Sequence, residues 1–142
     1  MKKVAEILAK KGGNIISVTP HSKVIDALQL MADRNIGSVM VMEGDKYCGL
    51  LTERDYARKV ILKGKASSET LVKEIMSDNL PQINRDSSID NCMQLMSDKN
   101  LRYLPVFESE KVIGIVSIND VIKAVMANQQ DTIAQLENYI QS

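Results

Sequence analysis

The chain contains an internal repeat, and this repeat constrains its fold more than any other feature of the sequence. Residues 22–58 align with residues 87–123 without a gap. Identical residues recur in register along the alignment, and they include the pairs Gln29 and Gln94, Asn35 and Asn100, Gly49 and Gly114, and Asp55 and Asp120. A register kept over such a length indicates two copies of one structural unit, each too small to bury a secure core by itself.

Each copy predicts the element series β-α-β-β-α. A short β-rich segment comes first, at 14–18 and again at 80–83. The helix that follows has apolar residues at i, i+3, i+4 and i+7, namely Val24, Ala27, Leu28 and Met31 in the first copy and Ile89, Cys92, Met93 and Met96 in the second. Two short strands then form a hairpin in each copy, and we expect second helices at 53–63 and 118–128.

The predicted fold is therefore α+β, with two β-α-β-β-α units packed sheet to sheet as a pseudo-twofold pair and with clefts at their seam. The expected boundaries are 1–66 for the first unit and 67–128 for the second. A further C-terminal helix is expected in 129–142, where it would dock, form a dimer or fray. Ser22 and Ser87 stand near the starts of the predicted first helices, where a hydroxyl can cap free backbone N–H groups.

Composition excludes several classes of protein. Lys plus Arg and Asp plus Glu both number 18, so the formal net charge is zero and a general nucleic-acid binder is not expected. No apolar run approaches the roughly 18 residues that a membrane-spanning helix needs, and the acidic Glu6 near the start is unlike a signal peptide. The two cysteines lie far apart, as in a reduced cytoplasmic protein, and a single histidine without a Cys-x-x-Cys pair predicts no metal site.

A second shared pattern closes the hairpin of each copy. It reads GLLTERD at 49–55 and GIVSIND at 114–120. A Ser or Thr followed three residues later by an acid is a capping box, which any protein can use to satisfy the first N–H groups of a helix. The same geometry suits a nucleotide, because a helix N-terminus attracts phosphate and a carboxylate accepts hydrogen bonds from ribose hydroxyls. The two interpretations are compatible.

With these motifs, the repeat unit resembles the CBS domain, named for cystathionine β-synthase. The resemblance rests on the two motifs and on the segments 24–41 and 100–106, which precede them. It covers residues 3–128, and the paired arrangement resembles a stand-alone Bateman module of the small bacterial type. The resemblance implies that the chain is not an enzyme, and the sequence offers no nucleophile with a positioned base.

Members of this family bind adenosine-containing ligands such as AMP, ADP, ATP, NAD(H) or S-adenosylmethionine. The resemblance implies that Asp55 and Asp120 hold ribose, and that Thr52 and Ser117 lie near ribose or phosphate. It also implies that adenine lies against the first strand of each copy, at Val18, Thr19, Pro20, Ile83 and Asn84. The nucleotide is then a ligand, and no cofactor or metal is required.

Basic side chains distinguish the two motifs. Arg54 and Arg58 are four residues apart, so on one helix face they could clamp a polyphosphate, whereas the second copy has the neutral Asn119 in place of Arg54. We therefore expect the first site to prefer the more charged nucleotide. Arg102, next to Tyr103, opens the second hairpin, from which family members often contact phosphate. The alternative for each arginine is a solvated surface charge.

Two classes of function follow. The first is a regulatory module that senses adenosine-containing nucleotides in clefts between the two units and acts on an unidentified regulated protein. The second is a structural or interaction module that forms a dimer without physiological nucleotide binding. A homodimer is expected, because paired units leave apolar helix faces exposed that a second copy can cover.

Overall fold

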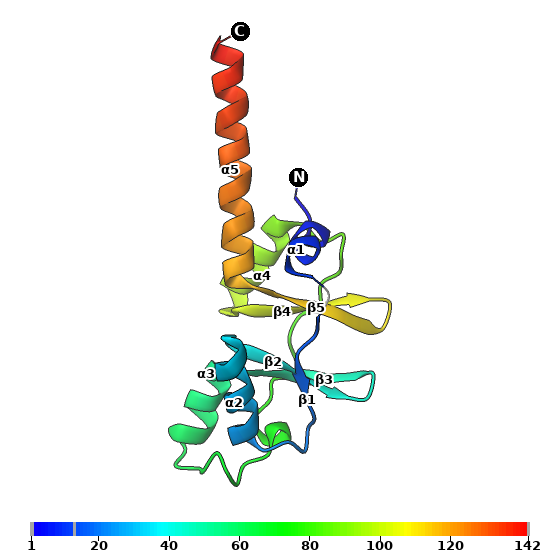
Figure 1. Cartoon of the computed structure of the whole chain (residues 1–142), viewed down its shortest axis with the longest axis vertical. Helices are drawn as coiled ribbons and strands as arrows, with labels where there is room; N and C mark the ends of the chain where they lie inside the picture. The colour runs from blue at the N-terminus through cyan, green and yellow to red at the C-terminus, as the bar shows by residue number, and fades with distance from the viewer. Residues whose placement is uncertain (1, 13, 142) are drawn as a thin grey trace. The chain divides into compact units, whose positions relative to one another are not determined.

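The structure, a computed structural model, describes residues 2–12 and 14–141, except for the side chains of residues 131, 132, 139 and 141. Packing divides the chain into two compact units. Residues Ile15–Leu80 form one, called the central unit below. Residues Met1–Asn14 and Pro81–Ser142 together form the other, called the split unit. Figure 1 labels the elements of both.

A three-stranded sheet organises the central unit. Its elements in chain order are β1 (Ser17–Val18), α2 (Val24–Arg34), β2 (Ser38–Glu43), β3 (Lys46–Thr52), α3 (Glu53–Tyr56), a π-helical turn (Ala57–Ile61) and a 3-10 helix (Val72–Glu74). The strand order is β1-β2-β3. Strands β2 and β3 form an antiparallel hairpin, and the intervening helix α2 allows β1 to run parallel to β2.

Local sequence accounts for the helix and hairpin of the central unit. Helix α2 ends at Asn35, whose φ of 53° lies in the left-handed region that Asn tolerates. Gly44 provides the positive φ of 62° that the β2–β3 turn requires. Buried apolar side chains from α2, the sheet, the π-helical turn and the segment of the 3-10 helix form one core, and they are Val24, Ala27, Met31, Val39, Val41, Leu51, Val60, Val72 and Ile75.

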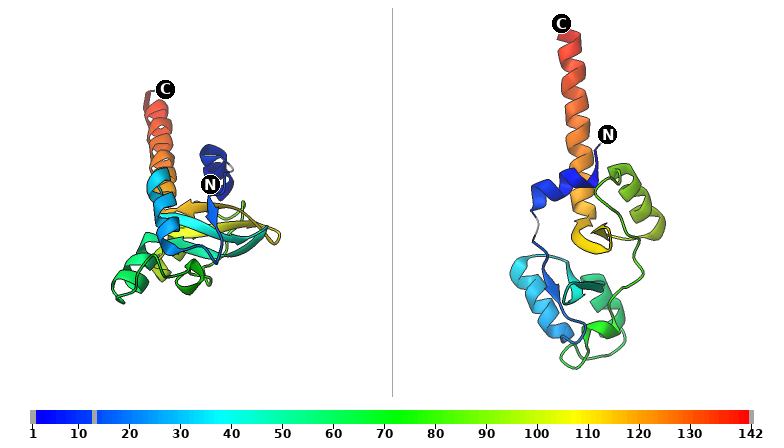
Figure 2. Two further views of the ribbon diagram at one scale, coloured as in Figure 1. Left: turned by 60° about the horizontal axis from the view of Figure 1, so that its bottom comes forward. Right: turned by 90° about the vertical axis from the view of Figure 1, so that its right-hand side faces the viewer.

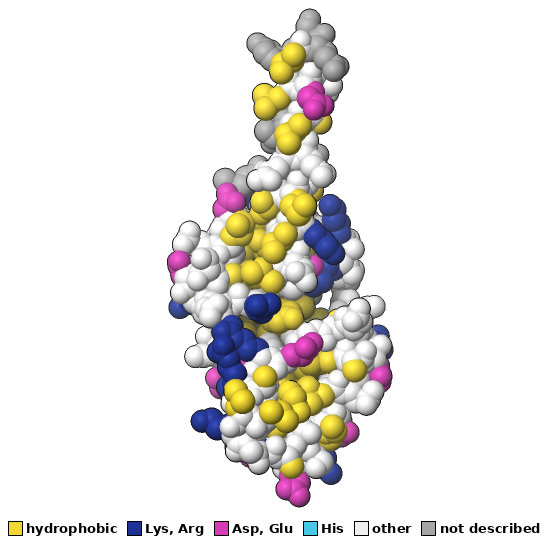
Figure 3. All heavy atoms as spheres, turned by 90° about the vertical axis from the view of Figure 1, so that its left-hand side faces the viewer, with side chains coloured by type: hydrophobic (Ala, Val, Ile, Leu, Met, Phe, Trp, Pro, Cys, Tyr) yellow, Lys and Arg dark blue, Asp and Glu magenta, His cyan; other side chains and the backbone are white. Residues whose placement is uncertain are grey.

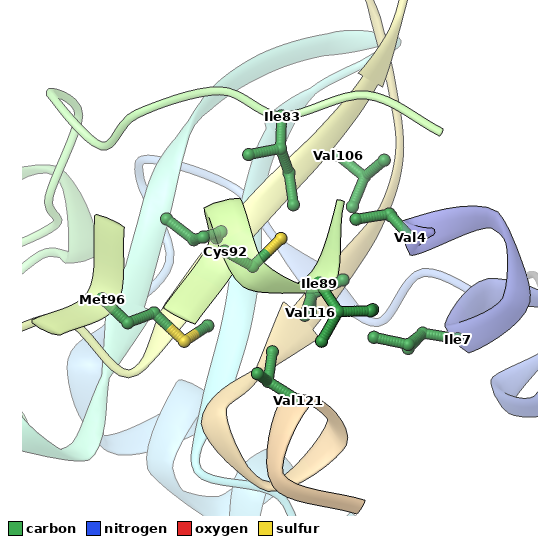
Figure 4. Close-up of a cluster of buried hydrophobic side chains, with 10 residues drawn as sticks. Val4, Ile7, Ile83, Ile89, Cys92, Met96, Val106, Val116 and Val121 are labelled. Carbon is green, nitrogen blue, oxygen red and sulfur yellow. The ribbon is translucent and has the colours of Figure 1, made fainter. Parts of the chain in front are cut away.

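The split unit repeats the hairpin and both helices. Its elements are α1 (Val4–Lys11), α4 (Ile89–Lys99), β4 (Tyr103–Glu108), β5 (Lys111–Ser117) and α5 (Ile118–Gln141). Strands β4 and β5 are antiparallel, and Ile83 adds a single parallel bridge to Val106 where β1 stands in the central unit. Figure 4 shows the core, in which Val4 and Ile7 of α1 point toward side chains of α4, β4, β5 and α5.

Helix α1 is bound to this unit through its backbone as well as its side chains. The N–H of Val4 donates to the carbonyl oxygen of Ser87 at 2.9 Å, and the N–H of Ile89 donates to that of Lys2 at 3.1 Å. Val4 is fully buried. The split unit is therefore built from two segments that lie far apart in the sequence.

The predicted α+β class is confirmed, and packing adds detail to the expected boundaries. The expected first unit, 1–66, and second unit, 67–128, follow the sequence repeat, whereas the compact units place residues 1–14 with the second copy. Within the described residues α5 runs to Gln141 as one helix of 24 residues. The segment 129–141, where a C-terminal helix is expected, continues α5, because the polar residues after 128 do not interrupt a helix. Ser142 lies outside the described residues.

Two serines differ from the expected caps. Helix α2 begins after Lys23 without a side-chain cap, and α4 is capped by Ser88, whose Oγ accepts from the N–H of Asn91 at 3.0 Å. Ser22 and Ser87 instead accept from the N–H groups three residues before them, and so they close the turns that lead into the helices. Among the described residues no helix is long and apolar enough to cross a membrane.

Candidate functional site

The second motif forms a capping box at the start of α5. Ser117 ends β5, and the backbone N–H of Ser117 donates to Oδ2 of Asp120 at 2.9 Å. The N–H of Asp120 donates in return to the Ser117 hydroxyl at 3.1 Å. These two bonds satisfy N–H groups at the helix start and fix the direction of the Asp120 carboxylate.

A lysine from helix α1 completes this arrangement. Nζ of Lys11 lies 2.8 Å from Oδ2 of Asp120 and 2.9 Å from the carbonyl oxygen of Ile115, to which it donates. Partial burial alone would raise the pKa of Asp120. The hydrogen bonds and positive charge of Lys11, with the hydrogen bonds from Ser117, outweigh that effect and hold the pKa of Asp120 below its usual value.

Asp120 lies in the wall of a pocket within the split unit. The pocket has a volume of about 470 Å³, and it is lined by Lys2, Glu6, Ile7, Lys10, Lys11, Ile89, Asp120, Lys123 and Ala124. Four lysines against two acidic residues make this lining positive. The side chain of Asp120 is 17% exposed, so its carboxylate is accessible while its orientation is fixed.

The first motif has the same capping box but a different surrounding. Thr52 caps α3, and Oδ2 of Asp55 accepts from the Thr52 backbone N–H at 3.1 Å and from its hydroxyl at 3.0 Å. Oδ1 of Asp55 accepts from the hydroxyl of Ser77 at 3.1 Å and lies 3.1 Å from Nζ of Lys59. Asp55 is only 8% exposed, so both oxygens are engaged inside the central unit.

The predicted arginine pair lies where the helix changes its geometry. Arg54 is half-buried in α3, and the exposed Arg58 belongs to the π-helical turn. Hydrogen bonds in a π-helix join residues five apart rather than four, so the two arginines do not belong to one regular α-helix. Lys59 is the cation at Asp55, and it also donates to the carbonyl oxygen of Ile75 at 2.9 Å.

The remaining predicted residues divide between the two units. Val18, Thr19 and Pro20 belong to the central unit with Thr52, and Pro20 is buried. The split unit holds the others, namely the buried Ile83, the exposed Asn84 and Arg102, and the half-buried Tyr103. Each unit thus contains one predicted set, and no group of His, Cys, Asp or Glu that could hold a metal occurs among the described residues.

Sequence reasoning missed several groups at the two motifs. Lys59 follows Asp55 by four residues, so helical spacing alone could have found it. Lys11 and Ser77 are distant in sequence from the aspartates that they contact, and no local pattern marks them. Lys2 and Lys10 reach the pocket through the packing of α1 on α5, which the repeat does not predict because the expected first unit contained α1.

Comparison with known proteins identifies the family. The model of the CBS domain matches residues 4–62 and again 72–127. The chain belongs to the CBS-domain family and carries two copies of the domain. This confirms the resemblance drawn from the two motifs.

Relatives and solved structures agree with this family assignment. The CBS domain-containing protein CBSX3, mitochondrial, of Arabidopsis thaliana is 33% identical over 147 aligned positions, which cover 97% of this chain and 71% of that protein. A protein with CBS domains from Burkholderia ambifaria MC40-6 has a TM-score of 0.86 at 43% identity, covering 90% of this chain and 96% of that one. The CBS domain pair of protein MJ0100, solved with 5'-methylthioadenosine and S-adenosylmethionine, shares the fold at 24% identity, with a TM-score of 0.79 and coverage of 90% and 98%.

Proposed function

We propose that the chain is a regulatory module that binds an adenosine-containing nucleotide, with its principal site in the lysine-lined pocket of the split unit. One observation carries this proposal: the capping box fixes the carboxylate of Asp120 in the wall of a positive pocket of about 470 Å³. A carboxylate beside several cations suits a ligand that has both hydroxyl groups and negative charge.

The chemistry of each group follows from its position. The Asp120 carboxylate accepts hydrogen bonds from ribose hydroxyls, as acids do in other nucleotide-binding folds. Lys10 attracts the phosphate groups, while Ile7 and Ile89 supply apolar contact for the base. The complex of MJ0100 with two adenosyl ligands supports the ligand class, because that protein has the same fold.

Lys11 couples binding to the position of helix α1. In the structure it pairs with Asp120 at 2.8 Å. A phosphate group in the pocket offers Lys11 a more highly charged partner and leaves Asp120 to the ribose. The ligand thereby replaces the direct ion pair between α1 and α5, and a separate regulated protein would respond to this change.

A second site at the first motif is proposed as the weaker one. It uses Thr52, Asp55, Arg54 and Arg58, with base contacts from the segment 18–20. A ribose there must compete with Lys59 and Ser77 for the Asp55 oxygens. We therefore expect this site to fill at higher ligand concentration. In the split unit, contacts from Ser117, Arg102, Tyr103, Ile83 and Asn84 stay predictions of the family resemblance, and none of these residues lines the pocket.

A thermal-melt panel tests the proposal. The purified chain is melted with AMP, ADP, ATP, NAD⁺, NADH and S-adenosylmethionine, after extraction shows that no nucleotide has copurified. A ligand present at about 100 times its dissociation constant adds roughly 2.7 kcal/mol, which raises the melting temperature by several degrees. Absence of any shift with every compound would overturn the proposal.

Matched variants locate the site. Asp120→Asn should abolish most of the shift, Asp55→Asn should preserve the tighter binding, and Asp45→Asn, an exposed turn residue, serves as the control. Lys11→Gln should weaken ATP more than adenosine, because adenosine has no phosphate for the lysine to bind. Equal losses in the Asp120 and Asp45 variants would contradict the assignment.

The interaction-module alternative has one specific observation in its favour. Helix α5 exposes large apolar side chains in its second half. A chain that dimerises through them but binds none of the six compounds would establish this alternative.

A further inference from the structure

Helix α5 carries an exposed apolar stripe that its own unit does not cover. The side chains in this stripe are between 48% and 79% exposed, and they are Ile122, Met126, Ile133, Leu136 and Ile140. Figure 3 shows such side chains along the helix that extends at the top of the view, and Figure 2 shows α5 continuing past α1 and α4. An exposed apolar stripe of this length indicates that another apolar surface covers it.

The stripe has the spacing of a coiled-coil seam. Met126, Ile133 and Ile140 are seven residues apart, and Ile122 and Leu136 fall at the other apolar position of the same heptads. The remaining seam position is the polar Gln129, which interrupts the apolar seam at a cost in stability. This face differs from the one that packs on the split unit, to which Val121, Ala124 and Val125 belong.

We infer that the seam binds the same seam of a second copy in an antiparallel coiled coil. In the register that pairs both ends, Ile122 lies against the partner's Ile140, Met126 against the partner's Leu136, and Gln129 against the partner's Ile133. Each residue of the seam then meets one of the other heptad position, as antiparallel packing requires.

Charge complementarity selects this orientation. Lys123 and Glu137 occupy the same flanking heptad position, so in the antiparallel register Lys123 lies beside the partner's Glu137 on both sides of the twofold axis. In a parallel pair these residues stay 14 positions apart, or about 21 Å along the helix, and do not meet. The antiparallel orientation also places the helix dipoles in opposition.

A charge exchange tests the pairing. Lys123→Glu leaves two acidic groups at the paired positions, and Glu137→Lys leaves two basic ones. Each variant alone should dimerise about tenfold more weakly by sedimentation equilibrium, because two exposed attractions become repulsions. An equimolar mixture should recover the affinity of the natural chain, since it restores opposite charges at both pairs. A mixture no tighter than either variant would overturn the antiparallel register.

Cross-linking separates this contact from a dimer formed through another surface. With Cys48 and Cys92 replaced by alanine, Lys123→Cys and Glu137→Cys chains are treated with a short bismaleimide, each alone and then mixed. Antiparallel pairing predicts a cross-linked product only in the mixture. Products from the separate variants would show a parallel coiled coil, and no product in any sample would show that α5 does not pair with itself. Both results would refute the proposal.

The seam has its own matched control. Ile133→Glu places a charge inside the interface and should abolish the cross-link, whereas Gln135→Glu adds the same charge outside the seam and should preserve it. Circular dichroism verifies that both variants fold. These experiments contain no nucleotide, so their outcome is independent of the proposed function.

Discussion

Gly49 and Gly114 occupy equivalent strand positions in the two copies, yet the structure predicts unequal losses of stability on substitution by alanine. A Cβ added at Gly49 would lie 2.7 Å from the carbonyl oxygen of Ser77, a backbone atom. A Cβ at Gly114 would lie 2.8 Å from Cδ2 of Leu8, which is the end of a flexible side chain. The two substitutions change the same residue in the same local fold, so each is the control of the other.

The loss of stability depends on which atoms must move to make room for the added Cβ. The Ser77 carbonyl accepts from the N–H of Leu50 at 2.9 Å, and the Ser77 N–H donates to the Leu50 carbonyl at 2.9 Å. Overpacking a core costs about 1–3 kcal/mol, and weakening these hydrogen bonds adds about 1 kcal/mol. We therefore expect Gly49→Ala to cost about 2–4 kcal/mol. At Gly114 a change of the Leu8 rotamer relieves the contact, for less than about 1 kcal/mol.

Thermal unfolding, monitored by circular dichroism, measures the loss of stability in both variants. For a chain of this length Gly49→Ala should lower the melting temperature by about 10 °C and Gly114→Ala by less than about 4 °C. The Ser77 hydroxyl also holds Oδ1 of Asp55, so Gly49→Ala should disturb the first motif. Equal costs, or a greater cost at Gly114, would refute the argument that backbone contacts are less adaptable than side-chain ends.

Three further predictions concern the termini of helices and the core. Asn35→Ala should cost about 1–2 kcal/mol while Asn35→Gly stays within about 0.5 kcal/mol of the natural chain, because only the alanine is strained in the left-handed region; chemical denaturation would measure both. Because the pKa of Asp120 is lower in the folded chain than its ordinary value of 3.8, the carboxylate stabilises the fold above pH 3.8, and this stabilisation is lost as the pH falls through the folded pKa. The loss of stability caused by Asp120→Asn should therefore shrink below about pH 4, in melts taken across the acid range. Leu104→Ala, at a fully buried strand position, should cost about 2–5 kcal/mol in denaturant unfolding, and a cost below about 1 kcal/mol would contradict the assigned core.

The repeat made the fold predictable because packing and sequence register are coupled. The apolar residues of α2 and α4 had to face a core, and the glycine–hydroxyl–aspartate motifs had to follow a strand. The structure places both as expected. The π-helical turn at 57–61 had no such signal, because the spacing of its apolar residues fits an α-helix as well.

Only the contacts between residues close in sequence could be predicted for the candidate site. The capping boxes lie within four residues, so spacing alone defines Thr52 with Asp55 and Ser117 with Asp120. Their partners Lys11 and Ser77 come from tertiary packing, which a single sequence does not encode in any local pattern. For the same reason the difference between the two aspartates, one enclosed and one in a pocket wall, could not be seen beforehand.

The split unit has a consequence for the order in which the chain folds. During synthesis the central unit, residues 15–80, emerges as one continuous segment, so its elements can pack together before residues 81–142 follow. Helix α1 emerges earlier but must wait, because the N–H of Val4 is bound by Ser87 and Ile89 binds back to Lys2. Closing that long loop costs less once the central unit has compacted the intervening residues. Helix α1 is thus synthesised before the surface on which it packs, and folding of the central unit shortens the loop that must close between them.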